Sequence, residues 1–162
     1  MNGLGVPQDV LPLQSSFLFS LVLKIRQVNE LGITPYGRRR IVDLQGGSFE
    51  GPKLSGIVRM SGADSAVVRP DGVFVPDVSL ILESEAGALV KMYYTGRWSA
   101  DPGHLERLLL REGDLTEGNS RLRVCGFFET ADEELEYLNR IVAVGVGVAT
   151  PAGITYQFHE IL

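Results

Sequence analysis

Polar residues that could do chemistry stand where short alternating runs are interrupted, between positions 37 and 77. Arg38, Asp64, Arg69 and Asp77 lie at or beside these breaks. If the runs are strands of a meander, their turns bring the four side chains to a common region. A carboxyl between apolar walls has a raised pKa and can exchange protons with a ligand, and a buried arginine can hold an oxyanion. We predict that Asp64 is an acid or base, that Arg69 holds the oxyanion, and that Arg38 and Asp77 contact the ligand.

A structural interpretation stands beside each of these roles. Asp64 can cap its own turn through the backbone. Arg69 can join two strands by pairing with Asp71 or Asp77. Arg38 is the first of three adjacent arginines, which cannot all face the interior of a strand-built fold. At the level of the sequence both interpretations stay open.

A second group of candidates brackets an acidic segment near the C-terminus. Glu129 is an alternative to Asp64 for moving a proton, and Tyr94, Tyr137 and Asn139 are expected to orient the ligand. The structural alternatives are that Thr130 and Asn139 cap a short helix and that the tyrosines are core residues with satisfied hydroxyls.

The sequence offers little for metal or nucleophilic chemistry. The two histidines, His104 and His159, have no second histidine at ligand spacing. Cys125 is the single cysteine, which excludes an internal disulfide and a cysteine-built zinc site, and its apolar strand favours an inert core residue. No nucleophile elbow is present. We therefore expect no metal and no cofactor.

Composition narrows the class of protein further. The chain has 162 residues, 44% hydrophobic and 22% charged, with a net charge of −5. No run of Lys and Arg exceeds the three at 38–40, which argues against a nucleic-acid partner. The first residues lack the basic segment of a secretory signal, and no apolar run approaches the ~20 residues of a membrane helix. We expect a cytoplasmic protein with no membrane partner.

The elements that must position these residues are mostly strands. Turn signals recur about every 8 to 12 residues, which is typical of an all-β sandwich or barrel, and 19 glycines that interrupt strands favour a barrel. We predict a buried strand at Phe17–Ile25, a connection at Gln27–Tyr36, a bend or bulge at Gly46-Gly47, and a short helix at His104–Arg111 within a flap. The expected fold is a single closed antiparallel β-barrel with one short helix, at residues 16–162, preceded by a flexible arm at residues 1–15.

Several strings carry a resemblance to a known family. They are GRRRIVDLQGGSFEGPKLSG, GAD followed by VRPDG, FETADEELEYLNR and VGVG. Together they resemble a microbial family of small β-barrels, domain of unknown function three-two-three-seven. The resemblance implies a calycin-like or allene-oxide-cyclase-like barrel, often dimeric, with a pocket at one mouth and no agreed chemistry. One departure is Tyr137, a phenol where the family tends to carry an indole.

These observations lead to a small-molecule-binding barrel as the main hypothesis. The ligand would be hydrophobic: aromatic, polyketide-like or terpenoid. If the protein is an enzyme, a cofactor-free isomerase, cyclase or lyase fits best, because one or two acid/base groups in a preorganised pocket suffice for proton shifts and ring closures. The alternative is a non-catalytic carrier or interaction protein whose barrel is filled by side chains. A homodimer is expected in either case.

Overall fold

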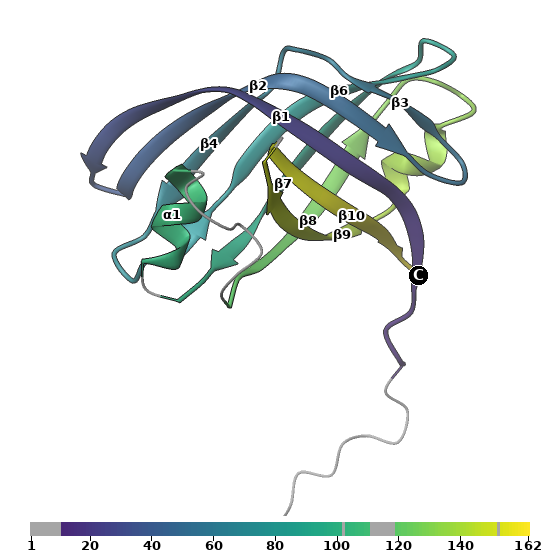
Figure 1. The fold of residues 1–162 in the computed structure, drawn as a ribbon. Coiled ribbons are helices and arrows are strands. Elements are labelled where there is room, and N and C mark those ends of the chain that lie inside the picture. Colours follow the sequence, from purple (N-terminus) through teal and green to yellow (C-terminus); the bar gives the residue numbers. More distant parts are fainter. Residues whose placement is uncertain (1–10, 102, 111–118, 152) are drawn as a thin grey trace, which may run out of the picture.

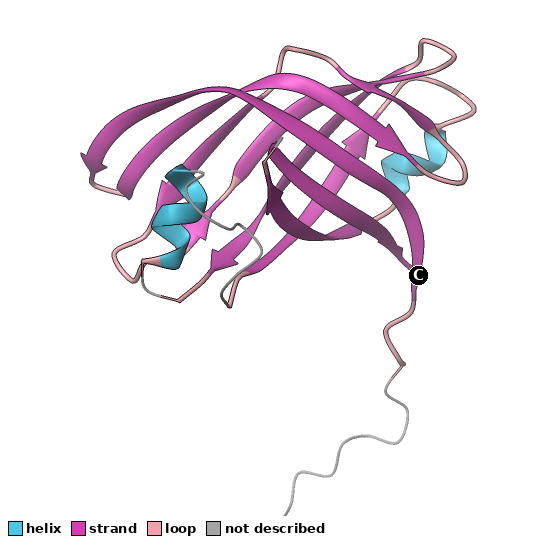
Figure 2. Cartoon of the chain, viewed as in Figure 1, coloured by secondary structure: helices cyan, strands magenta, loops and turns pink. Residues whose placement is uncertain are grey.

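The computed structural model describes residues 11–101, 103–110, 119–151 and 153–162 (Figure 1). Strands make up most of this part of the chain, with two short helices beside them (Figure 2). In chain order the elements are β1 (Ser15–Thr34), β2 (Gly37–Glu50), β3 (Ser55–Val58), β4 (Ala63–Val68), β5 (Phe74–Val75), β6 (Asp77–Ser84), β7 (Leu89–Ser99), α1 (His104–Leu110), β8 (Arg121–Glu129), η1 (Glu136–Arg140), β9 (Ala143–Thr150) and β10 (Gly153–Ile161).

The strands form one antiparallel sheet that closes on itself. Its order is β1-β10-β9-β8-β7-β5-β4-β2-β3-β6, and the additional pairing of β1 with β2 completes the ring. Closure pairs each long strand on both sides along at least part of its length, which removes most of the exposed edge of an open sheet. The predicted closed antiparallel barrel with one short α-helix is confirmed.

The first strand is longer than the sequence suggested. β1 continues to Thr34 and pairs with β2 from Ser20 onward, so the predicted connection at Gln27–Tyr36 is wrong. Only a tight turn at Pro35-Tyr36 separates the two strands. The pairing of β1 with β2 contains register shifts, and one of them falls between Glu30 and Gly32, where Gly32 has a φ of 85°. The bulge predicted at Gly46-Gly47 is confirmed, because the register slips beside Gly46, whose φ of 101° suits glycine.

The chain between positions 37 and 77 returns to β2 twice, which a simple meander would not do. The C-terminal half of β2 pairs with β3, and its N-terminal half pairs with β4. In the second pairing Arg40 lies opposite Ala66, and Val42 lies opposite Asp64. Because alternate residues of a strand share a face, Arg40 and Asp64 are diagonal neighbours on the inner face of the barrel.

Side chains fill one end of the barrel more completely than the other. Phe19 contacts Phe49, Phe128 and Phe158, with ring centroids 5.6, 6.0 and 5.6 Å away. Along β7 the inward residues run from Met92, which lies opposite Phe128, through Tyr94 to Trp98. The aromatic cluster therefore occupies the Met92 end, and the less filled space lies between the levels of Tyr94 and Trp98.

Glycines of β9 make room for the aromatic rings at this boundary. Gly145 and Gly147 face inward, while the valines between them face outward. A Cβ atom at Gly147 would lie 2.6 Å from Cε1 of Tyr156 and 2.5 Å from Cδ2 of Leu122. These glycines allow the rings and side chains of neighbouring strands to approach the backbone of β9 closely.

The two helices lie at opposite ends of the barrel (Figure 1). α1 confirms the predicted helix and buries Leu105 and Leu108; most of the predicted flap loop after it lies outside the described residues. η1 confirms a helical turn in the acidic segment, but Thr130 does not cap it: its hydroxyl accepts from the Asp132 N–H and donates to a β7 carbonyl. Within the described residues, neither helix has the length and apolarity to cross a membrane.

We predict that Gly147→Ala destabilises the barrel by about 1–3 kcal/mol, because the new methyl overpacks against Leu122 and Tyr156. The neighbouring Val146→Ala, at a position 43% exposed, is the matched control and should cost less than about 1 kcal/mol. Urea unfolding measures both values. Equal effects of the two substitutions would contradict the close packing around Gly147.

Candidate functional site

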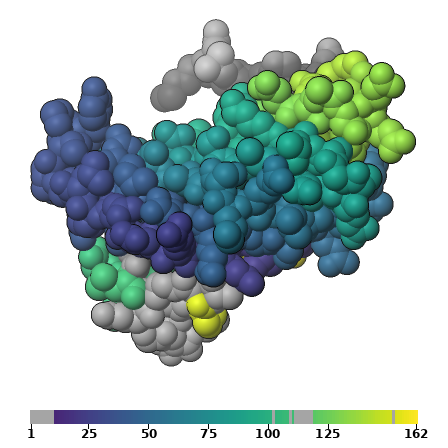
Figure 3. Space-filling view, turned by 90° about the horizontal axis from the view of Figure 1, so that it is seen from above, coloured from purple at the N-terminus to yellow at the C-terminus, as the bar shows by residue number. Residues whose placement is uncertain are grey.

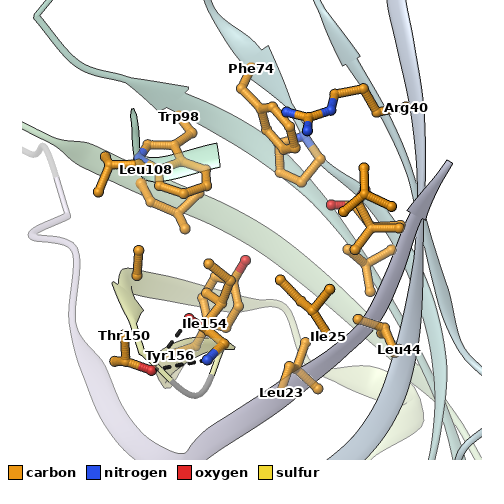
Figure 4. A pocket seen from close by; sticks show the side chains of 18 of the residues that line it. Leu23, Ile25, Arg40, Leu44, Phe74, Trp98, Leu108, Thr150, Ile154 and Tyr156 are labelled. Atoms are coloured by element: carbon orange, nitrogen blue, oxygen red, sulfur yellow. Dashed lines mark hydrogen bonds between the residues drawn. The ribbon is translucent and has the colours of Figure 1, made fainter. Parts of the chain in front are cut away.

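A cavity of about 60 Å³ lies at the less filled end of the barrel (Figure 4). Every strand except β3 contributes to its wall, and α1 adds Leu108. Most of the wall is apolar, and its apolar residues include Leu23, Leu44, Phe74, Trp98, Leu108 and Ile154. Polar groups enter it from Arg40, Asp64, Tyr94, Thr150 and Tyr156.

The cavity is compact because α1 lies against its side. Leu108 is 3% exposed and contributes to the wall, and Arg38 of β2 holds Glu106 of α1 through an Nη1–Oε1 contact of 3.2 Å. A volume of this size is well below the ~300–1,000 Å³ of drug-sized ligand sites. It is also below the volume of about 150 Å³ of an engineered cavity that binds benzene, so even a ligand with one ring requires the wall, to which α1 contributes Leu108, to move outward.

Asp64 is the acidic group of the cavity. It lies on β4 between Val42 of β2 and Val78 of β6, both buried. One carboxyl oxygen accepts a hydrogen bond of 2.8 Å from the backbone N–H of Asp77. Burial raises the pKa of Asp64 to about 7; the Asp77 N–H opposes this rise, and the Asp77 charge adds to it. Among the described residues, no cation forms a salt bridge with this carboxyl.

Two tyrosines complete the polar part of the wall. Tyr94 and Tyr156 are buried, with ring centroids 5.3 Å apart and planes at 65°. The interaction between the two side chains raises the pKa of Tyr94 and opposes the rise in that of Tyr156. Burial, the largest cause, raises the pKa of both residues, and the Asp64 charge raises both further. Both therefore stay protonated at neutral pH, and both lie within the electrostatic reach of Asp64.

The structure divides the predicted site residues into two groups. Asp64 and Tyr94 line the cavity. Arg38 lies outside the wall, bound to Glu106 and to Glu30. Asp77 acts on Asp64 through its backbone N–H and its charge, but its side chain is not part of the cavity wall.

The other four predicted residues lie outside the cavity wall. Arg69 is an exposed residue paired with Asp71 in the turn between β4 and β5. Glu129 is exposed at the end of β8. Asn139 exchanges two hydrogen bonds of 2.8 and 2.9 Å with the backbone of Thr130. Tyr137 lies on η1, which contributes nothing to the wall, and Lys53 lies over its ring. The structure thus does not bring these residues to Asp64.

Sequence reasoning missed Arg40, Tyr156 and Trp98 as members of the site. A signal was present for Arg40, because the alternation that places Val42 and Leu44 inward also places Arg40 inward. The same alternation on β10 aligns Tyr156 with Phe158. Nothing in the local sequence indicates that Tyr156 contacts Tyr94, which comes from a different part of the chain.

The described residues contain no cluster of three or more His, Cys, Asp or Glu side chains that could hold a metal ion. His104 is buried at the start of α1, with Nδ1 3.4 Å from Arg107. His159 packs edge-on against Phe17. Neither histidine lines the cavity.

Fold and site together define a closed antiparallel β-barrel with a mainly apolar pocket at one end. The chain matches the family described as "Protein of unknown function (DUF3237)" over residues 13–161. It therefore belongs to this family, as its strings suggested.

Comparisons with individual proteins agree with this assignment. A UPF0311 protein of Rhodopseudomonas palustris is 26% identical over 151 residues, which cover 93% of this chain and 97% of that protein. A β-barrel-like protein of Acinetobacter baumannii has a crystal structure similar to this chain, with a TM-score of 0.83 and 28% identity over 96% of this chain and 99% of that one. An enzyme of Penicillium herquei shares the fold, with a TM-score of 0.72 and 19% identity over 97% of this chain and 100% of that one.

We predict that Asp64→Asn stabilises the protein at pH 8. The folded-state pKa of Asp64 lies above its unfolded value, so its contribution to stability is fully present below about pH 4 and is lost as the pH rises through about 7. Asparagine keeps the acceptor for the Asp77 N–H without the charge. The gain at pH 8 should be on the order of 2–4 kcal/mol and should disappear toward pH 4.

Urea unfolding of both proteins at a series of pH values measures this difference. Asp71→Asn, in the exposed turn between β4 and β5, is the control, and its difference from the parent should show no such rise toward pH 8. A difference for Asp64→Asn that stays constant from pH 4 to pH 8 would contradict the raised pKa.

Proposed function

We propose that the cavity is the active site of a cofactor-independent isomerase that moves a proton on a compact hydrophobic carbonyl compound. The observation that supports this most is a carboxyl without a salt-bridge partner among the described residues, held in an apolar wall beside two tyrosine hydroxyls. Such a pocket provides a base and hydrogen-bond donors, which are the groups that enolisation requires.

In the proposed reaction the Asp64 carboxylate removes a proton from the carbon next to the carbonyl group. The electron pair of that C–H bond forms a carbon–carbon double bond, and the carbonyl π electrons move to oxygen. In a ligand whose own carbon–carbon double bond is conjugated with this enolate, the carboxylic acid of Asp64 then returns the proton to the far carbon of that double bond. The double bond shifts toward the carbonyl group, and the electron pair on oxygen re-forms the carbonyl. The substrate and product have the same atoms, and Asp64 ends the cycle ionised.

The tyrosine pair is suited to the charge that develops on the ligand oxygen. Tyr94 and Tyr156 both line the cavity, and each hydroxyl can donate its proton to a ligand oxygen. Hydrogen bonds in series polarise one another, and a low local dielectric strengthens each of them. Because burial raises the pKa of both tyrosines, they act as donors rather than as bases.

The pKa of Asp64 suits the role of base. A general base works best when its pKa lies near the working pH, because it is then both ionised and basic enough to take the proton. An exposed aspartate, whose pKa is near 4, would be a weak base at neutral pH. A pKa of about 7 makes the carboxylate of Asp64 a stronger base at the same pH.

The fold is compatible with catalysis, since the enzyme of Penicillium herquei shares this barrel. A non-catalytic carrier is the second candidate, favoured by a single observation: the cavity is mostly apolar. In a carrier, Asp64 would not exchange a proton with the ligand.

The test uses 2-indanone, a compact ketone with acidic protons next to its carbonyl group. Exchange of these protons in D₂O, followed by proton NMR, reports proton transfer without knowledge of the natural substrate. We predict protein-dependent exchange that rises with pH through about 7 and falls at least 100-fold in Asp64→Asn.

Asp71→Asn is the matched control and should exchange protons at the parental rate, because its carboxyl lies in an exposed turn. Binding of 2-indanone without protein-dependent exchange would favour the carrier. Equal exchange by the parent and by Asp64→Asn would remove Asp64 from the mechanism.

A further inference from the structure

The cavity holds a buried cation that the proposed proton transfer does not use. Arg40 is 5% exposed, and Figure 4 shows its guanidinium extending from β2 toward Phe74 at the cavity. The wall around it is mostly apolar, and burying a cation in such surroundings is costly without a partner that forms good hydrogen bonds. The question is which group neutralises Arg40.

The counter-charge that the described residues supply is incomplete. Nε of Arg40 lies 3.2 Å from Oε2 of Glu30, yet its N–H makes no hydrogen bond with good geometry and is fully buried. The same carboxylate receives two hydrogen bonds from Arg38, of 3.1 and 3.2 Å. Glu30 is also 38% exposed, so water screens its charge. Glu30 is therefore bound mainly to Arg38, and Arg40 keeps donor capacity toward the cavity.

Asp64 does not take this role either. Arg40 and Asp64 are diagonal neighbours across β2 and β4, a spacing of roughly 7–8 Å in a sheet. No salt bridge joins them, and Arg40 is not among the groups that shift the pKa of Asp64. A ligand between them would meet a cation on one side and a proton-exchanging carboxyl on the other.

We infer that the ligand of this cavity is a compact apolar molecule with one ionised acidic oxygen, a carboxylate or an acidic phenol, which Arg40 binds. The inference rests on the proposed function in using the same cavity, and it names the substrate class. The ionised oxygen accepts hydrogen bonds from the planar guanidinium, the apolar body packs among Phe74, Trp98 and Leu108, and the reacting carbonyl reaches Tyr156. Arginine is suited to this task because its fork of donors matches a carboxylate.

The structural alternative is that Arg40 only clamps β1 to β2 through Glu30, its direct partner across the two strands. This alternative predicts no preference for acids over neutral ligands of the same shape. Binding of matched ligand pairs therefore separates the two interpretations.

The experiment measures binding by quenching of Trp98, the single tryptophan of the chain and part of the cavity wall. The probes are benzoic acid with benzamide, and 2-naphthoic acid with 2-naphthamide, at pH 8. Each pair has one shape and differs in charge, and the two pairs compare a single ring with a fused pair of rings. We predict that the better-fitting acid binds about 10- to 100-fold more tightly than its amide.

Three variants test whether Arg40 is the source of the preference for the acid over its amide. Arg40→Met should abolish it, and Arg40→Lys should retain part of it. Glu30→Gln should increase it, because Arg40 loses its competing anion. Arg39→Met is the control on the opposite face of β2, where Arg39 donates to the Ser65 carbonyl, and should leave the preference unchanged.

Equal binding of acid and amide by the parent, binding of neither acid, or a preference unaltered by both Arg40→Met and Glu30→Gln would overturn the inference. If Arg40→Met does not fold, Arg40→Lys and Glu30→Gln still decide it. Asp64→Asn should keep the acid preference, so a failure of proton exchange with an intact preference would reject the proposed function alone.

Discussion

The arrangement of the site depends on the partial filling of a closed barrel. Aromatic rings around Phe19 occupy one end so completely that glycines of β9 are needed beside them. At the other end the inner wall keeps a cavity, and the strand period places a carboxyl and a guanidinium on it. Each charged group there loses hydration, and protein groups replace only part of the hydrogen bonds and charge stabilisation that water would provide. This incomplete replacement raises the pKa of Asp64 and leaves Arg40 able to bind an anion.

The polar groups of the cavity come from strands that are distant in sequence but adjacent in the barrel. Asp64 and Tyr94 lie in one row across β4, β6 and β7, because each lies opposite Val78 in its pairing. Tyr156 enters from β10 and meets Tyr94 across the interior. A rigid closed sheet holds such groups with little freedom to move, which is the condition for electrostatic preorganisation. α1 completes the wall from outside the sheet, fixed by Arg38 and Glu106.

The barrel could be predicted from the sequence because alternation, turn residues and interrupting glycines are local signals. The sequence singles out Asp64 because it stands beside a break after Gly62, and the structure instead places it within β4, on the same face as Ala66. The sequence could not show whether Arg69 and Asn139 reach the cavity. Both stand near breaks between strands, and a break places a residue at one end of the barrel without indicating which end. The cavity is formed by residues within strands, such as Arg40 and Tyr156, and which strands meet across the interior is a property of the closed sheet.

The central claim is that Asp64 titrates near neutrality inside the cavity. Carbon-13 NMR of the aspartate carboxyl groups measures this directly, with the Asp64 signal assigned by its absence from a variant that lacks the residue. The account predicts a titration midpoint near pH 7. A midpoint near 4, the ordinary value for an exposed aspartate, would show that water reaches the carboxyl freely and would contradict the account.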